Sequence, residues 1–190
     1  MIKKKNIIKK IAETHFKNSP KSNLSVQLGL DTICIFYKTA FESEYAKVFY
    51  SSKDDEILCA SIVFINYLKF ETELKKKLIW LILLKLFTFS IKLSVILDIL
   101  KKKKIEKKAL KKIMINCHLG MFFTNKKLKP ESTFELIKNF KKMHFFARQK
   151  SKNIWAVVDN NNKNALKFLE KLGYRTFFFS NNKIYLNKAL

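Results

Sequence analysis

Residues 126 to 133 hold the densest group of side chains that could bind an anion. They include three cations and two hydroxyl donors, namely Lys126, Lys127, Lys129, Ser132 and Thr133. An apolar strand is predicted before them, over Ile113–Thr124, and a helix after them, from about Phe134 to Gln149. Ser132 or Thr133 could cap that helix. The N-terminus of a helix attracts negative charge, so this junction could receive an anionic group.

Few other residues have the chemistry of a catalytic or metal-binding group. The histidines, His15, His118 and His144, suit proton transfer because the ordinary pKa of imidazole is near 6.5. We expect His144 on the surface of its helix. Three isolated cysteines lie within apolar stretches, at Cys34, Cys59 and Cys117. They predict buried thiols in a reducing compartment, with no disulfide and no metal site.

The formal charge of +24 is extreme but does not select a partner. A basic surface attracts nucleic acid, anionic lipid and phosphorylated ligands alike. The strong preference for lysine over arginine also fits an AT-rich genome, and no nucleic-acid-binding motif is visible. Nucleic acid is therefore not the expected partner. The N-terminus carries charges without a continuous apolar stretch, which predicts a cytoplasmic protein.

A length of 190 residues with 48% apolar content predicts one domain, 1–190, with a buried core. Periodicity predicts an amphipathic helix over residues 5–16 and a second helix over Leu24–Phe41 despite Gly29. Two β-hairpins are also predicted. Their strands are Ala46–Ser51 with Ile57–Ile65, and Tyr174–Phe179 with Lys183–Asn187.

The stretch Ile154–Tyr174 reads as strand, Asn-rich turn, helix and Gly stop. It resembles the C-terminal half of the GNAT acyltransferases. The matching residues are Val157, Val158, Asn162, Ala165, Phe168 and the run Glu170-Lys171-Leu172-Gly173-Tyr174. The N-terminal region resembles a subset of the same family through Ala12, Glu13, His15, Pro20, Leu24-Ser25 and Leu28-Gly29.

The resemblance implies an α+β fold with a mixed, mostly antiparallel central sheet flanked by helices. It places a helical, apolar and basic insertion, at about residues 66–112, between the third and fourth core strands. It also implies that acetyl-CoA or another acyl-CoA binds along the strand, loop and helix around residues 113–149, without a metal. The cofactor-binding residues that it implies are Phe122, Phe123, Lys126, Lys127, Lys129, Ser132, Thr133, Asn162 and Phe168.

The activity implied is transfer of an acyl group to an amine by direct attack, with a strand amide near Phe122 or Phe123 stabilising the oxyanion. The acceptor would be a small molecule or a peptide. The titratable residues nearest the expected cleft are Glu13, His15 and His118. Each also has a structural interpretation: Glu13 and His15 as exposed or capping groups, and His118 as a hydrogen-bonded histidine in a buried strand.

Four positions depart from the family pattern. Its Gly-containing loop falls here on Leu128, Glu131 and Thr133, and a tyrosine that can protonate the leaving thiolate is replaced by Leu169. A second hypothesis therefore stays open. The chain could be a catalytically inactive GNAT-like module that binds a partner or a membrane surface.

The centre of the predicted insertion, Leu78–Leu100, has the length of a membrane span and lies between two lysine clusters. Lys85 and Lys92 near its middle offset most of the gain from its apolar residues. Three interpretations stay open: a helical cover for the core, a surface that lies on anionic lipid at the inner face of a membrane, and a transmembrane span.

Overall fold

The computed structural model describes residues 2–19, 24–87, 116–180 and 182–190. Its helices are α1 (Ile2–Asn18), α2 (Leu24–Gln27), α3 (Leu30–Glu42), α4 (Tyr67–Phe87), a 3-10 turn η1 (Lys126–Leu128), α6 (Lys129–Arg148) and α7 (Lys163–Lys171). Its strands are β1 (Ala46–Lys53), β2 (Glu56–Phe64), β3 (His118–Thr124), β4 (Asn153–Asp159), β5 (Arg175–Ser180) and β6 (Lys183–Ala189).

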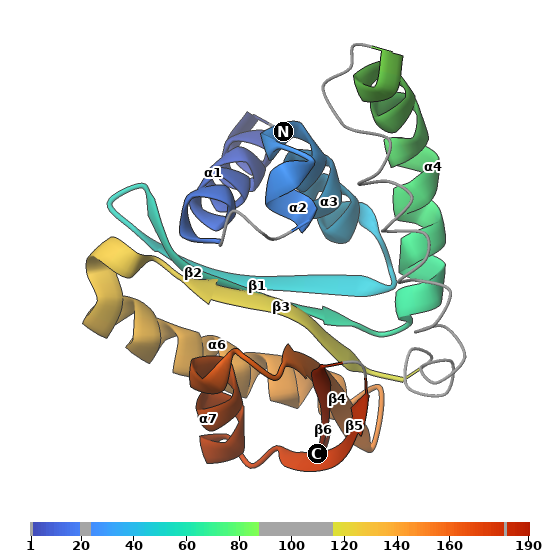
Figure 1. The fold of residues 1–190 in the computed structure, drawn as a ribbon. Helices are drawn as coiled ribbons and strands as arrows, with labels where there is room; N and C mark the ends of the chain where they lie inside the picture. The colour runs from blue at the N-terminus through green and yellow to red at the C-terminus, as the bar shows by residue number, and fades with distance from the viewer. Residues whose placement is uncertain (1, 20–23, 88–115, 181) are drawn as a thin grey trace.

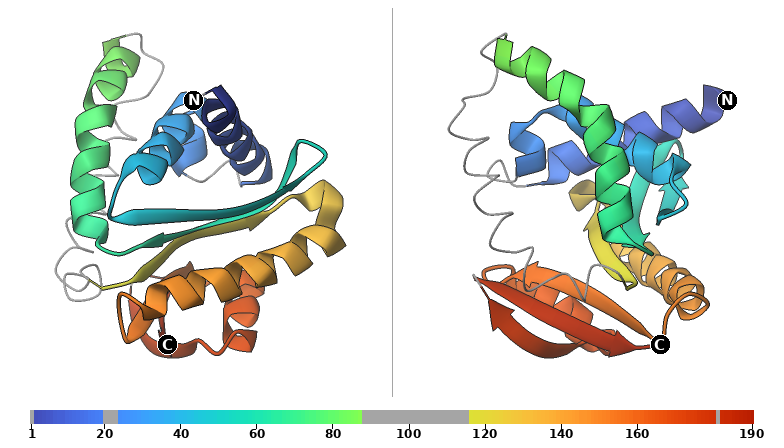
Figure 2. Two further views of the ribbon diagram at one scale, coloured as in Figure 1. Left: turned by 180° about the vertical axis from the view of Figure 1, so that it is seen from behind. Right: turned by 90° about the vertical axis from the view of Figure 1, so that its right-hand side faces the viewer.

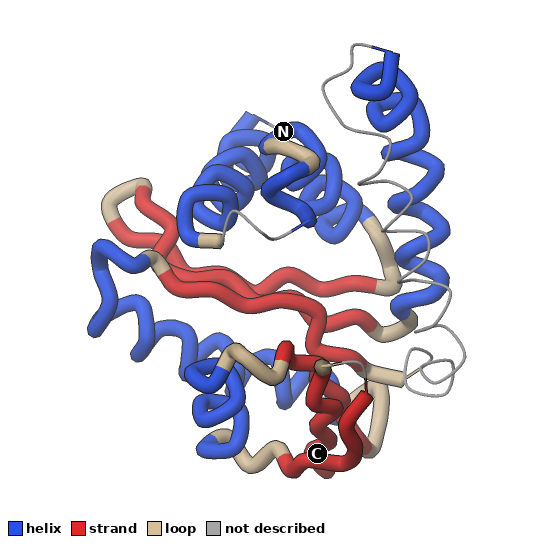
Figure 3. Tube along the Cα trace, in the orientation of Figure 1, coloured by secondary structure: helices blue, strands red, loops and turns tan. Residues whose placement is uncertain are grey.

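The six strands form one mixed sheet in the order β1-β2-β3-β4-β6-β5. The β3–β4 pair is parallel and the other four pairs are antiparallel. Helices α1 to α3 cover one face of β1 to β3, and α6 runs across the other face (Figure 1). The strands β4, β5 and β6 turn away from the first three (Figure 3). The predicted α+β fold with a mostly antiparallel sheet is confirmed.

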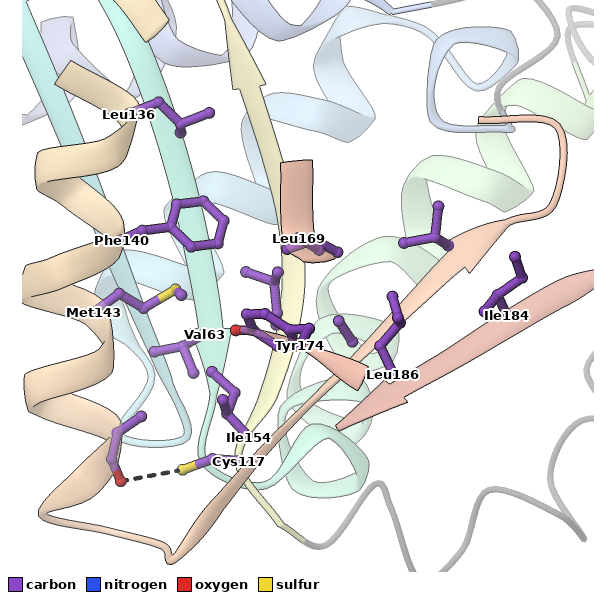
Figure 4. Packing of buried hydrophobic residues seen from close by; sticks show 14 of the residues in the cluster. Val63, Cys117, Leu136, Phe140, Met143, Ile154, Leu169, Tyr174, Ile184 and Leu186 are labelled. Atoms are coloured by element: carbon purple, nitrogen blue, oxygen red, sulfur yellow. Dashed lines mark hydrogen bonds between the residues drawn. The ribbon is translucent and has the colours of Figure 1, made fainter. Parts of the chain in front are cut away.

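Each face of the sheet has its own apolar core. The first core lies under α6 and α7, where Phe140, Met143 and Leu169 pack against β3, β4 and β6 (Figure 4). The second lies under α1, α3 and α4 and is rich in aromatic rings, including Tyr37 and Phe64. Because both faces are covered, β2 is buried at every residue except Glu56.

Both predicted hairpins are present. The β1–β2 turn is made by Asp54 and Asp55, whose φ angles of 46° and 66° give the twist that a tight hairpin needs. Asn182, with φ of 60°, lies in the β5–β6 turn. Asp and Asn tolerate this left-handed region better than other residues with side chains, which explains why polar turns mark both connections.

The predicted helix over Leu24–Phe41 is wrong as a single helix. Gly29 adopts φ of 87° and separates α2 from α3. A residue in this conformation cannot continue a right-handed helix, so the chain changes direction there.

Helix α6 begins five residues earlier than predicted, at Lys129 rather than Phe134. Pro130 lies in its first turn, where a missing N–H costs nothing. Ser132 and Thr133 therefore lie inside the helix and do not cap it.

The predicted insertion is described only in part. Two strands, rather than three, precede it in the described chain, and its described part is the helix α4. Residues 88–115, including most of Leu78–Leu100 and the start of the predicted strand Ile113–Thr124, lie outside the described residues. Among the helices that the structure describes, none combines the length and apolarity needed to cross a bilayer.

Candidate functional site

A cleft opens where β3 and β4 stop pairing. The two strands pair only through His118 with Trp155 and Leu119 with Ala156, and beyond these residues they diverge. The resulting cavity has a volume of about 250 Å³. It is lined by β3, β4 and α7, through Leu119, Gly120, Met121, Phe122, Ala156, Val157, Val158, Asp159, Asn162, Ala165 and Leu169.

A β-bulge accompanies this divergence. On β2, the neighbours Ile62 and Val63 pair with Met121 and Leu119, which leaves Gly120 as an extra residue on β3. A Cβ atom at Gly120 would lie 2.0 Å from Cε2 of the buried Phe64 ring. Only glycine therefore fits this position, although nothing in the sequence around Gly120 indicated a bulge.

Backbone direction on β3 shows which amides face the cleft. The N–H of Asn125 donates to the carbonyl oxygen of Leu58 on β2 over 2.7 Å. Because N–H direction alternates along a strand, the N–H of Phe123 also faces β2, and the N–H of Phe122 faces the cleft. Of the two amides predicted to stabilise an oxyanion, the structure thus places only that of Phe122 on the open side.

Asn162 lies at the rim of the cleft and starts α7. Its Oδ1 accepts a hydrogen bond from the N–H of Ala165 over 3.1 Å, so it is the N-cap of this helix. Phe168 packs against both Phe122 and Phe140, with ring centroids 5.6 and 5.3 Å away. It supports the wall of the cleft from the core side.

Leu169 lines the cleft with a fully buried side chain. An alkyl group at this position cannot donate a proton. The acid that the resemblance implies at this position is therefore missing.

The loop between β3 and α6 already uses three of its amides. The N–H of Lys126 donates to Asn18 Oδ1 over 3.0 Å, that of Lys127 to Asn125 Oδ1 over 3.1 Å, and that of Leu128 to the Asn125 carbonyl over 3.2 Å. Pro130 has no N–H to offer. A diphosphate would therefore find fewer free backbone donors here than at an ordinary helix N-terminus.

The side chains of this loop are still cationic on balance. Lys126 and Lys127 are exposed, and Glu131, the acid that would repel an anion, forms an ion pair with Lys53 at 2.9 Å. Ser132 is fully buried and its Oγ has no hydrogen-bond partner among the described residues. The hydroxyl of Ser132 is therefore not presented to solvent beside the lysines.

His15 is buried, although an exposed or capping position was the alternative expectation for it. Its Nδ1 lies 3.2 Å from the hydroxyl of Tyr37, and its ring stacks on Phe123 with a centroid distance of 5.5 Å. The same hydroxyl contacts Met121 Sδ at 3.7 Å, and Met121 lines the cleft. The His15–Tyr37 pair thus stands directly behind the cleft wall. No pattern in the sequence pointed to Tyr37 as a partner of His15.

The other two candidate bases lie elsewhere. Glu13 is partly exposed on α1, 3.9 Å from Lys9 Nζ. His118 stacks against Phe64 and meets Tyr67 edge-on, and its Nδ1 is shielded from solvent without a hydrogen-bond partner among the described residues. The expectation of a hydrogen-bonded His118 is therefore wrong for that nitrogen.

Burial lowers the pKa of His15 and of His118 to about 4. Both imidazoles are consequently neutral near pH 7, and both are weak bases. They can accept a proton only transiently.

His144 is not the surface histidine that we predicted. Its Nε2 lies 3.0 Å from the Tyr174 hydroxyl, and its Nδ1 lies 3.4 Å from Nζ of Lys188. Burial, with a smaller effect of Lys188, lowers the pKa of His144 to about 4. This group joins α6 to β6 on the core side of the sheet. Among the described residues, no cluster of side chains could hold a metal ion.

The fold has known relatives among solved structures. No protein-family model matches the chain, and no curated protein sequence matches it significantly. The structure of PH1933 from Pyrococcus horikoshii superimposes with a TM-score of 0.59 at 13% identity, covering 96% of this chain and 90% of that one. The C-terminal condensation domain of Ebony, in complex with β-alanyl-dopamine, gives 0.58 at 12%, covering 100% and 96%.

Campylobacter jejuni N-acetyltransferase PseH, in complex with acetyl coenzyme A, gives a TM-score of 0.47 at 12% identity, covering 89% of this chain and 84% of that one. At such identities the likeness concerns the fold. The chain shares its α+β fold with PH1933 and with the Ebony domain.

Proposed function

We propose that the protein transfers an acyl group from an acyl-CoA thioester to the amine of a small molecule or a peptide. The observation that carries this proposal is the divergence of β3 from β4, which leaves strand backbone facing a cavity of about 250 Å³. Unpaired strand edges can hydrogen-bond an extended, amide-containing chain. The pantetheine arm of coenzyme A is such a chain.

In this proposal the amine nitrogen attacks the thioester carbonyl carbon. A C–N bond forms, the C–S bond breaks, and the coenzyme leaves as a thiolate. The N–H of Phe122, which points into the cleft, would donate to the oxyanion. The protein contributes position and this donor, because Leu169 provides no acid and the nearby histidines are weak bases.

Water would take one proton from the ammonium before attack. The second proton, which the nitrogen must lose to become a neutral amide, would pass to water or to the departing thiolate as the C–S bond breaks. The rate should therefore rise with pH towards the pKa of the acceptor amine, without an inflection near 6.5 from a histidine. The Ebony domain, which shares the fold, is in complex with β-alanyl-dopamine, itself an amide, and this motivates amines as the first acceptors to test.

The cleft offers more hydrogen-bonding groups to the pantetheine arm of the coenzyme than to its diphosphate. Asn162 and the β3 edge suit the pantetheine arm, whereas the loop amides of residues 126–128 are engaged within the protein. The diphosphate would rely on Lys126 and Lys127. We therefore expect weak, salt-dependent binding of coenzyme A.

The test has two parts. Calorimetric titration with acetyl-CoA and with desulfo-CoA measures binding, and absence of heat at millimolar ligand would overturn the proposal. Release of free CoA thiol in the presence of a panel of amines measures transfer. Mixtures without an amine control for hydrolysis of the thioester.

A second candidate is a non-catalytic module with the same fold. The engaged loop amides and the buried Leu169 favour it, because they remove phosphate donors and an acid that the resemblance implies. It predicts that no amine in the panel releases thiol, even where calorimetry detects coenzyme binding.

A further inference from the structure

The C-terminal half of α4 is only partly covered by the rest of the described chain. Its first turns pack into the aromatic core, where Phe70 is fully buried and Glu71 is 7% exposed. Past residue 75 the surroundings change, and three large apolar side chains face solvent. Trp80 is 72% exposed, Ile79 55% and Leu83 38%.

These three side chains share one side of the helix. At about 100° per residue, residues 79, 80 and 83 lie within an arc of about 100°. The end of α4 that carries them projects beyond the layer of α1 to α3 in two views at right angles (Figures 1 and 2). The exposed side chains thus form an apolar tip.

Exposed lysines precede the tip by one turn. Lys75, Lys76 and Lys77 are all exposed, and ion pairs hold Lys75 beside Glu71 at 3.3 Å and Lys77 beside Glu42 at 2.7 Å. The whole chain carries a formal charge of +24. An anionic surface would therefore attract the molecule from a distance and find cations next to the tip.

We infer that the tip of α4, Ile79 with Trp80 and Leu83, docks on the surface of an anionic lipid bilayer. If α4 lies along the membrane on this side, Ile79, Trp80 and Leu83 reach the boundary between head groups and acyl chains, while Lys75 and Lys76, which project to the same side, reach the head groups. Tryptophan is favoured at that boundary because its ring is amphipathic. A nucleic acid would use the lysines but leave Ile79 and Leu83 in water. This inference does not depend on the proposed acyl transfer.

Trp80 provides a direct probe. The chain has two tryptophans, so a Trp155→Phe protein reports on Trp80 alone. This full-length protein is titrated with vesicles of phosphatidylcholine, with and without phosphatidylglycerol. We expect binding only to the anionic vesicles, release by salt, a blue shift of Trp80 emission, and quenching by lipids brominated near the head group.

Two variants in the natural background separate the apolar and cationic contributions by flotation. Ile79→Ser with Trp80→Ser should weaken anionic-vesicle binding about tenfold or more. Its control is Phe134→Ser with Phe145→Ser, which removes side chains of similar exposure, 60% and 68%, from α6. Replacing Lys75, Lys76 and Lys77 by Gln should also weaken binding by about tenfold or more. Its control makes the same change at the exposed Lys141, Lys150 and Lys152.

Thermal melts establish that each variant is folded. The inference is overturned by absent binding to anionic vesicles, by equal binding to neutral ones, or by an unshifted Trp80 spectrum. It is also overturned if either control variant loses as much affinity as its test variant. Finally, duplex DNA is added as a competitor. Binding to DNA that depends on Ile79 and Trp80 as strongly as vesicle binding would show that the tip is not specific for lipid.

Discussion

Gly120 is the residue on which the geometry of the cleft depends most directly. It forms the bulge that precedes the divergence of β3 from β4, and the Phe64 ring occupies the space where a side chain would lie. We predict that Gly120→Ala lowers the free energy of unfolding by about 1–3 kcal/mol, because the buried ring or the strand must move. Urea denaturation measures this.

Phe64→Ala supplies the control for that prediction. In this background the added methyl group meets no ring, so Gly120→Ala should cost clearly less than in the natural protein. Equal costs in the two backgrounds would contradict the assigned contact.

Asn162 combines a structural and a proposed binding role, and two substitutions separate them. Asn162→Ala removes the cap and should cost about 1 kcal/mol of stability. Asn162→Asp keeps an oxygen that can accept from the Ala165 N–H, and should therefore preserve the melting temperature. If the side-chain amide donates to pantetheine, both variants weaken coenzyme A binding. If calorimetry shows unchanged affinity for coenzyme A in both variants, Asn162 acts only as the N-cap of α7.

At the scale of elements, we expect the charges at the N-terminus of α6 to influence the affinity for the phosphates of coenzyme A. Glu131 in its first turn faces Lys53 on the β1–β2 hairpin. We predict that Glu131→Gln strengthens coenzyme A binding several-fold at low salt, because it removes a negative charge near the expected phosphates. Lys53→Gln should have the opposite effect, since it leaves Glu131 uncompensated. Calorimetric titrations with coenzyme A at two salt concentrations test both variants. A change in affinity in the same direction for both would contradict the prediction.

At the scale of the whole molecule, three partly or fully buried histidines link stability to pH. Burial lowers the pKa of His15, His118 and His144 from 6.5 to about 4. The unfolded chain therefore binds more protons than the folded one between these values, so stability is complete above pH 6.5 and declines as pH falls towards 4. Each histidine contributes a slope of up to about 1.4 kcal/mol per pH unit.

Urea midpoints measured across this range should fall steadily with pH. A His144→Gln variant should show a shallower decline, because one of the three proton-linked groups is gone. Stability that does not change between pH 6.5 and 5 would contradict the folded-state neutrality of these side chains.

Local signals in the sequence determined most of the elements and their order. Several of these signals act within a few residues, so a single chain segment contains the information. They are the polar turn residues Asp54, Asp55 and Asn182, the Asn162 cap and the Gly173 stop. The φ of 87° at Gly173 and the capping bond of Asn162 are such local effects. They predicted the elements, whereas the α+β fold and a binding role for Asn162 were expected from the resemblance that the same residues carry.

Tertiary structure alone decided which chemical groups meet. The apolar periodicity of Leu24–Phe41 favoured one continuous helix, but Gly29 adopts a positive φ angle and interrupts it. Hydrophobic periodicity contains no information about the φ angle of a glycine. His15 contacts the hydroxyl of Tyr37, which is 22 residues away in the sequence. The N–H of Lys126 donates to Asn18 Oδ1, which is 108 residues away. The side chains of residues 126–133 suggested an anion site. In the folded protein, however, the backbone N–H groups of residues 126–128 donate to Asn18 and Asn125. Contacts between remote segments depend on how strands and helices pack, and no local pattern encodes them.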